Sequence, residues 1–150
     1  MFATEQEMSF LFEKFLKANF GNSYLKECQG LFGVPDFVFC AKQKKDVSII
    51  SFELKLKNWK WAAKQAFRYK SFSHVSYVVL ASRSANAALN NIEIFEKYNI
   101  GLAKFDNNSD FEILFKPESN LPYSENLHQK IVESLSMCSE KSKNIQTLVR

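Results

Sequence analysis

Two apolar segments on either side of a short polar turn constrain the fold of this chain more than any other feature. Val34 to Ala41 and Val47 to Lys57 are rich in Val, Ile and Phe, and the turn Gln43-Lys44-Lys45-Asp46 separates them. Segments of this composition, bounded by turn residues, are typical of β-strands. The sequence therefore predicts an antiparallel hairpin at this point in the chain.

Further helices and strands are predicted on both sides of the hairpin. Apolar residues recur at helical spacing from Thr4 to Asn19, where Thr4 and Glu7 can form a capping box and Gly21-Asn22 can end the helix. The other predicted elements are a helix of about Trp59 to Phe72 capped by Asn58, a strand Val75 to Ala81, a helix of roughly Ala87 to Tyr98, strands Gly101 to Phe105 and Phe111 to Phe115 joined by the turn Asp106-Asn107-Asn108-Ser109, and a closing helix Asn126 to Cys138. This order predicts an α/β fold with a mixed sheet and helices on both faces.

Length and composition favour a single packed domain. The chain has 150 residues, of which 46% are hydrophobic, and it contains only four Gly and three Pro. This composition argues against disordered and loop-dominated architectures. We expect one domain from residue 1 to 150, in which the polar last dozen residues, 139–150, form a frayed end.

Neither a membrane segment nor a disulfide framework is expected. Charged residues interrupt the apolar positions of Met1 to Phe20, so this segment matches neither a signal peptide nor a membrane span. The three cysteines, Cys28, Cys40 and Cys138, are odd in number and have no metal-type spacing. These features predict a cytoplasmic protein with no membrane partner.

Positive charge is concentrated in one part of the chain. Between Lys42 and Lys70, nine basic residues stand against Asp46 and Glu53, so nine minus two leaves +7 here and −3 for the rest of the net +4. A local basic field suits a polyanion, because each neutralised phosphate releases counterions. A solvated helix face is the alternative interpretation of such a lysine-rich stretch.

Three charged residues of the hairpin are predicted to lie close together. Side chains alternate along a strand, so Glu53 and Lys55 share one face while Leu54 points to the other. Since 36 plus 53 equals 44 plus 45, a turn centred on Lys44-Lys45 places Asp36 beside Glu53. Two carboxylates repel unless a cation lies between them, and a hard cation such as Mg²⁺ prefers oxygen ligands. Lys55 can then orient or deprotonate an attacking water, or stabilise charge on a phosphate.

A solvated, half-exposed strand is the plainer interpretation of an isolated Glu-x-Lys pair. Here the pair is not isolated, and the sequence resembles the PD-(D/E)xK nuclease superfamily, whose motif corresponds to Pro35-Asp36 and Glu53-Leu54-Lys55. Members share a helix, a strand hairpin, a helix and a further strand in this order, so the resemblance covers about Thr4 to Ser82. It implies a restriction endonuclease-like core in which Asp36, Glu53 and the Leu54 carbonyl bind Mg²⁺, with Mn²⁺ as a substitute, and Lys55 is the catalytic lysine.

The resemblance also suggests site residues on the two helices. Some members, such as the archaeal Holliday-junction resolvases, supply a glutamate from the first helix. Glu5, at the edge of the apolar face, is better placed for this role than Glu7 or Glu13, although a contact with the helix dipole is an equally good role for it. Several branches carry a Gln and a Tyr spaced as Gln65 and Tyr69 are. Gln65 can fix a water or phosphate, and Tyr69 can either stack on a base or sugar or simply pack.

The predicted function combines this site with the basic stripe behind it. Lys60, Lys64 and Arg68 are spaced four apart along one helix, and Lys57 precedes them, so these residues are predicted to hold a DNA backbone. We therefore expect an Mg²⁺-dependent nuclease that hydrolyses DNA phosphodiester bonds in restriction, repair or recombination. A non-catalytic nucleic-acid-binding module with the same fold, and a protein-interaction subunit with a Phe-rich patch, are the alternatives. The choice between DNA and RNA, and a homodimer that would bring two sites to two strands, stay open.

Overall fold

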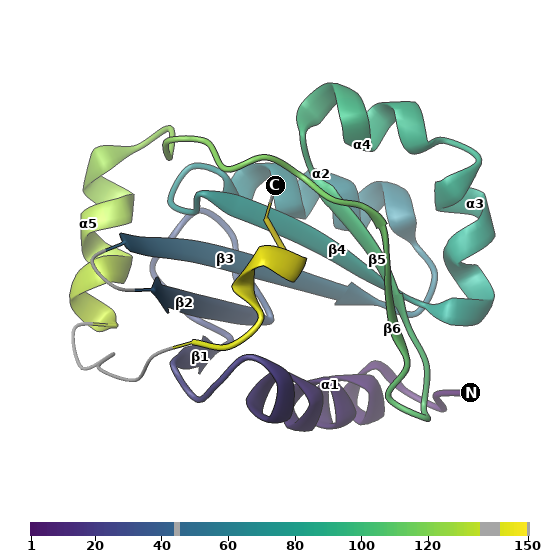
Figure 1. Ribbon diagram of the computed structural model, residues 1–150. Coiled ribbons are helices and arrows are strands. Elements are labelled where there is room, and N and C mark those ends of the chain that lie inside the picture. The colour runs from purple at the N-terminus through teal and green to yellow at the C-terminus, as the bar shows by residue number, and fades with distance from the viewer. Residues whose placement is uncertain (44–45, 136–141, 150) are drawn as a thin grey trace.

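A six-stranded mixed sheet forms the centre of the molecule (Figure 1). The computed structural model describes residues 1–43, 46–135 and 142–149. In order across the sheet, the strands are β1 (Tyr24–Lys26), β2 (Phe37–Gln43), β3 (Asp46–Lys55), β4 (Val75–Ala81), β5 (Gly101–Phe105) and β6 (Phe111–Phe115). The pairs β1–β2 and β2–β3 are antiparallel, the pairs β3–β4 and β4–β5 are parallel, and β5–β6 is antiparallel. The predicted α/β class with a mixed sheet is therefore confirmed.

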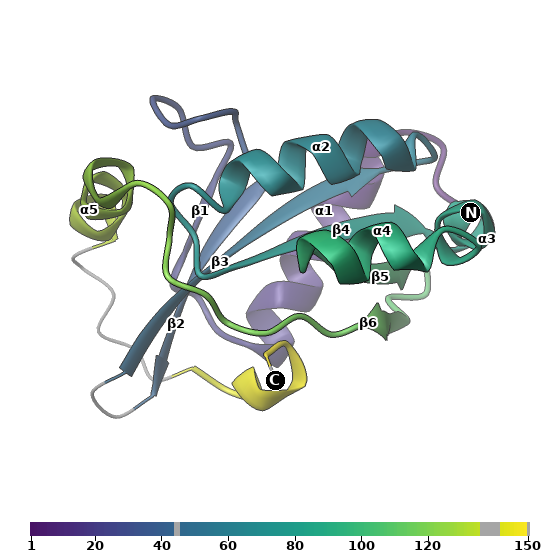
Figure 2. The same ribbon diagram turned by 90° about the horizontal axis from the view of Figure 1, so that it is seen from above.

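Helices cover both faces of the sheet (Figure 2). On one face, α1 (Glu5–Asn19) packs Phe12 against Phe52 of β3, with ring centroids 5.3 Å apart. On the other face, α2 (Trp59–Tyr69) packs over Val78 and Leu80 of β4, and α5 (Glu125–Ser134) packs over Val38, Cys40 and Ile49 of the hairpin. Because strand side chains alternate, each central strand supplies both apolar layers.

The hairpin has the predicted register. Phe37 faces Phe52 and Gln43 faces Asp46, so the numbers of facing residues add up to 89 along the whole β2–β3 ladder. The two residues at the centre of the predicted turn, Lys44 and Lys45, lie outside the described residues. The alternation is also as predicted, because Phe52 and Leu54 belong to the apolar layer beneath α1.

The ends of α1 follow local sequence signals. Thr4 caps the helix with its hydroxyl oxygen, which accepts a hydrogen bond from the Glu7 amide at 3.1 Å. The Glu7 carboxylate in turn accepts from the Ala3 amide at 2.9 Å. At the other end, Gly21 adopts a φ of +135°, which favours glycine, and its amide bonds the Leu16 carbonyl. The predicted helix is confirmed.

Several strand boundaries differ from those predicted. β2 begins at Phe37 rather than at Val34, because Gly33 has a φ of +84° and Pro35 has no amide hydrogen to give to a ladder. β3 is Asp46–Lys55, two residues shorter at its end than predicted. β1 was not predicted at all, since a strand of three residues is too short to carry a recognisable alternation.

The helices after the hairpin are also shorter than predicted. α2 ends at Tyr69 rather than at Phe72. The predicted helix from Ala87 to Tyr98 is instead two helices, α3 (Ala85–Leu89) and α4 (Ile92–Tyr98). Asn90 and Asn91 separate them, because asparagine competes for backbone hydrogen bonds and is a poor residue for a helix interior. α5 ends at Ser134, and residues 136–138 of the predicted closing helix lie outside the described residues.

The end of the chain packs against the core. Ile145 and Leu148 are buried in the same apolar layer as α1, and the Tyr77 hydroxyl donates to the Leu148 carbonyl at 2.6 Å. Residues 142–149 are therefore anchored to the sheet rather than frayed, whereas 139–141 and 150 lie outside the described residues. Within the described part of the chain, no helix is long and apolar enough to cross a membrane.

Candidate functional site

Asp36 lies immediately before β2, beside the end of β3. Its amide donates to the Phe52 carbonyl at 3.1 Å, so Asp36 is bonded to β3 at the residue before Glu53. Its carboxylate oxygen Oδ2 accepts a hydrogen bond from the Leu54 amide at 2.7 Å. The backbone of β3 thus fixes this carboxylate in place.

Glu53 points to the face of the sheet that α2 covers, and its residue is only 7% exposed. Its oxygen Oε1 lies 2.5 Å from the Tyr69 hydroxyl, which is also 3.0 Å from the Val34 carbonyl oxygen. A phenol has one proton to donate, so two acceptors compete for it when Glu53 is ionised. When Glu53 is protonated, it can donate to Tyr69 while Tyr69 donates to Val34.

The neighbouring carboxyl groups are both harder to ionise than usual. Burial raises the pKa of Asp36 to about 6, against the opposing effect of the Leu54 amide. Burial, followed by the charge of Asp36, raises the pKa of Glu53 to about 7, although the Tyr69 hydroxyl acts in the opposite direction. Burial disfavours the charged form of each carboxyl group, and at Glu53 the charge of Asp36 adds to that cost. The pair is therefore suited to binding a positive charge.

Lys55 and Glu5 lie at the end of β3 next to this pair. The Lys55 Nζ is 3.7 Å from Oε1 of Glu5, and the other oxygen of Glu5 accepts from the Leu56 amide at 3.2 Å. Glu5 is thus the glutamate of α1 that contacts the end of β3. Glu7 instead bonds the Ala3 amide, and Glu13 bonds the Tyr24 hydroxyl at 2.5 Å.

Gln65 and Tyr69 lie side by side on α2 under the loop that leads into β2. A Cβ added to Gly33 in this loop would lie 2.9 Å from Cε1 of Tyr69 and 3.3 Å from Oε1 of Gln65. Gln65 is buried, and its amide has no hydrogen-bond partner among the residues that the structure describes. Its amide is therefore free to hold a water or a ligand oxygen.

The structure corrects the stacking role predicted for Tyr69. The residue is only 1% exposed, and its ring packs against Phe72 with centroids 5.9 Å apart, so no base or sugar can reach it. Its hydroxyl instead holds Glu53. The sequence could not decide this, because the spacing of Gln65 and Tyr69 does not show how deeply α2 sits on the sheet.

The basic residues of the region divide into two groups. Lys57, Lys60 and Lys64 are exposed, and the Arg68 guanidinium lies 5.2 Å from the centre of the Phe32 ring. Lys70 does not belong to this surface, because its buried Nζ donates to the Tyr98 carbonyl at 2.8 Å at the end of α4. The exposed positive charge around α2 is therefore smaller than the count of basic residues between Lys42 and Lys70 indicated.

A metal could be held here by only a few protein ligands. Among residues 1–43, 46–135 and 142–149, no group of three or more His, Cys, Asp or Glu side chains could bind a metal ion. Asp36 and Glu53 offer two carboxylates, and the Leu54 carbonyl points toward β2, as its amide does. Mg²⁺ is commonly bound through one or two carboxylates, with waters and substrate phosphates as the other ligands. The donor set fits this mode.

Comparisons with known proteins show a similarity in fold only. No protein-family model and no curated protein matches the chain. Among solved structures, a protein of unknown function from Silicibacter pomeroyi is similar over 89% of this chain and 84% of that chain, with a TM-score of 0.58 and 15% sequence identity. At this identity the likeness shows the fold alone, so function must be argued from the site.

Proposed function

We propose that this protein is an Mg²⁺-dependent deoxyribonuclease with a restriction endonuclease-like core, a member of the PD-(D/E)xK superfamily. The observation that supports the proposal is the position of Asp36, which bonds the backbone of Phe52 and Leu54 on either side of Glu53, with Lys55 two residues after Glu53 on the same strand. The order of α1, the hairpin, α2 and β4 also agrees with the core of that superfamily. DNA is the proposed partner.

Asp36, Glu53 and the Leu54 carbonyl would hold the cation. The raised pKa of both carboxyl groups supports this role, because a divalent cation would offset the cost of burying their charges and, at Glu53, the repulsion from Asp36. Bound there, the cation would act as a Lewis acid on a phosphate oxygen and lower the pKa of a bound water.

The side chains around the cation would orient the reactants. Lys55 would position the attacking water or stabilise charge on the phosphate, and its contact with Glu5 would keep the ammonium close to the end of β3. Gln65 would hold a water or a phosphate oxygen through its free amide. Tyr69 would act as a positioning residue, because its hydroxyl donates a hydrogen bond to Glu53. Cleavage of both strands would need two such centres, which a homodimer would supply.

The direct test is cleavage by the purified protein in Mg²⁺ or Mn²⁺, on duplex, branched and single-stranded DNA and on RNA. We expect Asp36→Ala and Lys55→Ala each to lower the cleavage rate at least ~100-fold while leaving DNA binding largely intact. Lys104→Ala is the matched control for Lys55, because Lys104 is also a strand lysine paired with a glutamate, 3.6 Å from Glu112. That variant should cleave normally.

Absence of cleavage on every substrate, with DNA binding retained, would replace the enzyme by the non-catalytic binding module. Equal losses in Lys55→Ala and Lys104→Ala would also contradict the assignment of Lys55. RNA cleavage without DNA cleavage would keep the chemistry and change the substrate.

A further inference from the structure

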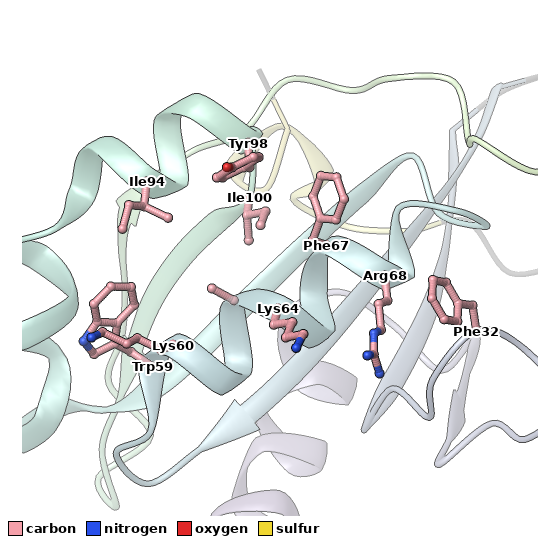
Figure 3. A pocket seen from close by; sticks show the side chains of 10 residues that line it. Phe32, Trp59, Lys60, Lys64, Phe67, Arg68, Ile94, Tyr98 and Ile100 are labelled. Carbon is pink, nitrogen blue, oxygen red and sulfur yellow. The ribbon is translucent and has the colours of Figure 1, made fainter.

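A groove of about 600 Å³ lies between α2 and the α4 side (Figure 3). Trp59, Ala63 and Phe67 of α2 form one wall, and the α4 side contributes Ile94 and Tyr98. The volume lies within the range of ligand sites, and the lining is mainly apolar and aromatic. The sequence does not indicate this groove, because its two walls come from helices separated by more than twenty residues.

Three basic side chains follow one rim of the groove. Lys60, Lys64 and Arg68 are spaced four apart on α2, about one helical turn each, and all three line the groove. No acidic residue is among the ten that line it. The groove therefore joins an apolar floor to a positively charged rim.

The same basic row separates the groove from the carboxylate pair. At roughly 100° per residue, Ala63 and Phe67 lie on one side of the row on α2, and Gln65 and Tyr69 lie on the other. Because Tyr69 bonds Glu53, a ligand in the groove and a phosphate at Glu53 would bind opposite flanks of one helix. The row of Lys60, Lys64 and Arg68 lies between these two flanks, so its positive charges can contact phosphates of either ligand.

The groove contains exposed aromatic rings. Phe67 and Tyr98 are 41% and 43% exposed, and their rings lie 5.5 Å apart in an edge-to-face arrangement. Tyr123 continues this row, with its ring 6.1 Å from that of Phe67. Aromatic faces beside a line of Lys and Arg are the arrangement by which proteins bind single-stranded nucleic acid, through base stacking and phosphate contacts.

We propose that this groove binds single-stranded DNA, with bases against Phe67 and Tyr98 and phosphates along Lys60, Lys64 and Arg68. The inference rests on the proposed function, because binding of single-stranded DNA here would direct the nuclease to substrates that carry a single-stranded segment. An acidic amphipathic peptide would also match the charge of the rim. The aromatic character of the exposed groups favours the nucleic acid.

Binding is tested without cleavage, in EDTA, with fluorescein-labelled oligo-dT. We expect Phe67→Ala to weaken binding roughly 5- to 100-fold, which is the loss of one stacked base, and Phe67→Tyr to restore it. Phe10→Ala is the matched control, because Phe10 is an exposed helical phenylalanine on α1 with Lys14 Nζ 4.5 Å from its ring. This variant should bind as the wild type does.

Two further measurements locate the ligand. The chain has two tryptophans, so Trp61→Phe leaves Trp59 of the groove as the single emitter, and oligo-dT should quench it. Lys64→Ala should reduce the slope of log affinity against log salt by about 0.7.

Equal affinities of Phe67→Ala and Phe10→Ala, or binding of oligo-rU but not oligo-dT, would overturn the proposal. So would quenching of Trp59 by an acidic amphipathic peptide and not by oligo-dT. The two proposals fail separately. Groove binding without cleavage of any substrate contradicts the nuclease alone, and cleavage without groove binding contradicts this inference alone.

Discussion

The Tyr69 hydroxyl donates a hydrogen bond to Oε1 of Glu53 over 2.5 Å, and so ties α2 to the strand that carries the candidate catalytic residues. The same hydroxyl lies 3.0 Å from the Val34 carbonyl in the loop before β2. One buried phenol therefore connects the three segments that form the site. Loss of this contact should affect the ionisation of Glu53 more than the fold.

Tyr69→Phe should shift the pH dependence of cleavage. The Tyr69 bond lowers the pKa of Glu53, so its removal should raise that pKa further and move the acidic limb of the pH–rate profile to higher pH. At pH 8, where Glu53 is ionised, stability should fall by about 1.5–3 kcal/mol, the usual contribution of a hydrogen bond to a charged group. Tyr24→Phe is the control, because Tyr24 makes the same 2.5 Å bond to Glu13 on α1. A pH–rate profile that moves equally in both variants would contradict the positioning role.

Glu53→Gln should stabilise the metal-free protein at pH 8. Because the pKa of Glu53 rises on folding from 4.5 to about 7, its favourable contribution is complete below pH 4.5 and is lost as the pH rises through 7. The neutral Gln avoids that loss, so urea denaturation in EDTA should show a gain of roughly 1–3 kcal/mol at pH 8 and little change at pH 4.

Glu13→Gln should have the opposite sign at pH 8. The Tyr24 hydroxyl, together with Lys26, lowers the pKa of Glu13, so its ionised form stabilises the fold above the unfolded pKa. A loss of stability in Glu53→Gln at pH 8 would show that the ionised Glu53 carboxylate does not destabilise the metal-free protein. Added Mg²⁺ should raise the melting temperature of the wild type and leave that of Glu53→Gln unchanged.

Gly33→Ala should displace Tyr69 and lower cleavage. The new Cβ would lie 2.9 Å from Cε1 of Tyr69, which must then move away from Glu53. Gly30→Ala is a close control, because its φ of +83° matches the +84° of Gly33 while its Cβ would meet only the flexible end of Lys130. Both variants should lose about 1–2 kcal/mol through backbone strain. Only Gly33→Ala should lose activity, and equal activities would refute the steric link to Tyr69.

Leu148→Ala should destabilise the protein by about 2–5 kcal/mol in urea denaturation, because Leu148 is completely buried in the layer beneath the sheet. Leu121→Ala, at a residue 84% exposed, should change stability by no more than about 0.5 kcal/mol. Similar small effects in both variants would mean that the end of the chain is not part of the core in solution.

The sequence determined the features that depend on neighbouring residues. Alternation and turn position predicted the hairpin register, in which Phe37 faces Phe52 and Gln43 faces Asp46, because the side-chain period of a strand is two and a hairpin has one centre. Thr4 and Gly21 marked the ends of α1 through hydrogen bonds within a few residues. These local interactions leave a signal that can be read in order along the chain.

The tertiary structure decided the surroundings of those residues. The contact of Tyr69 with Glu53 spans 16 positions, that of Glu5 with Leu56 spans 51, and that of Tyr77 with Leu148 spans 71. No periodicity encodes such pairings, because they depend on how α1, α2 and the chain end pack on the sheet. Burial follows from that packing, and with it the raised pKa values, the inaccessible ring of Tyr69 and the groove beside α2.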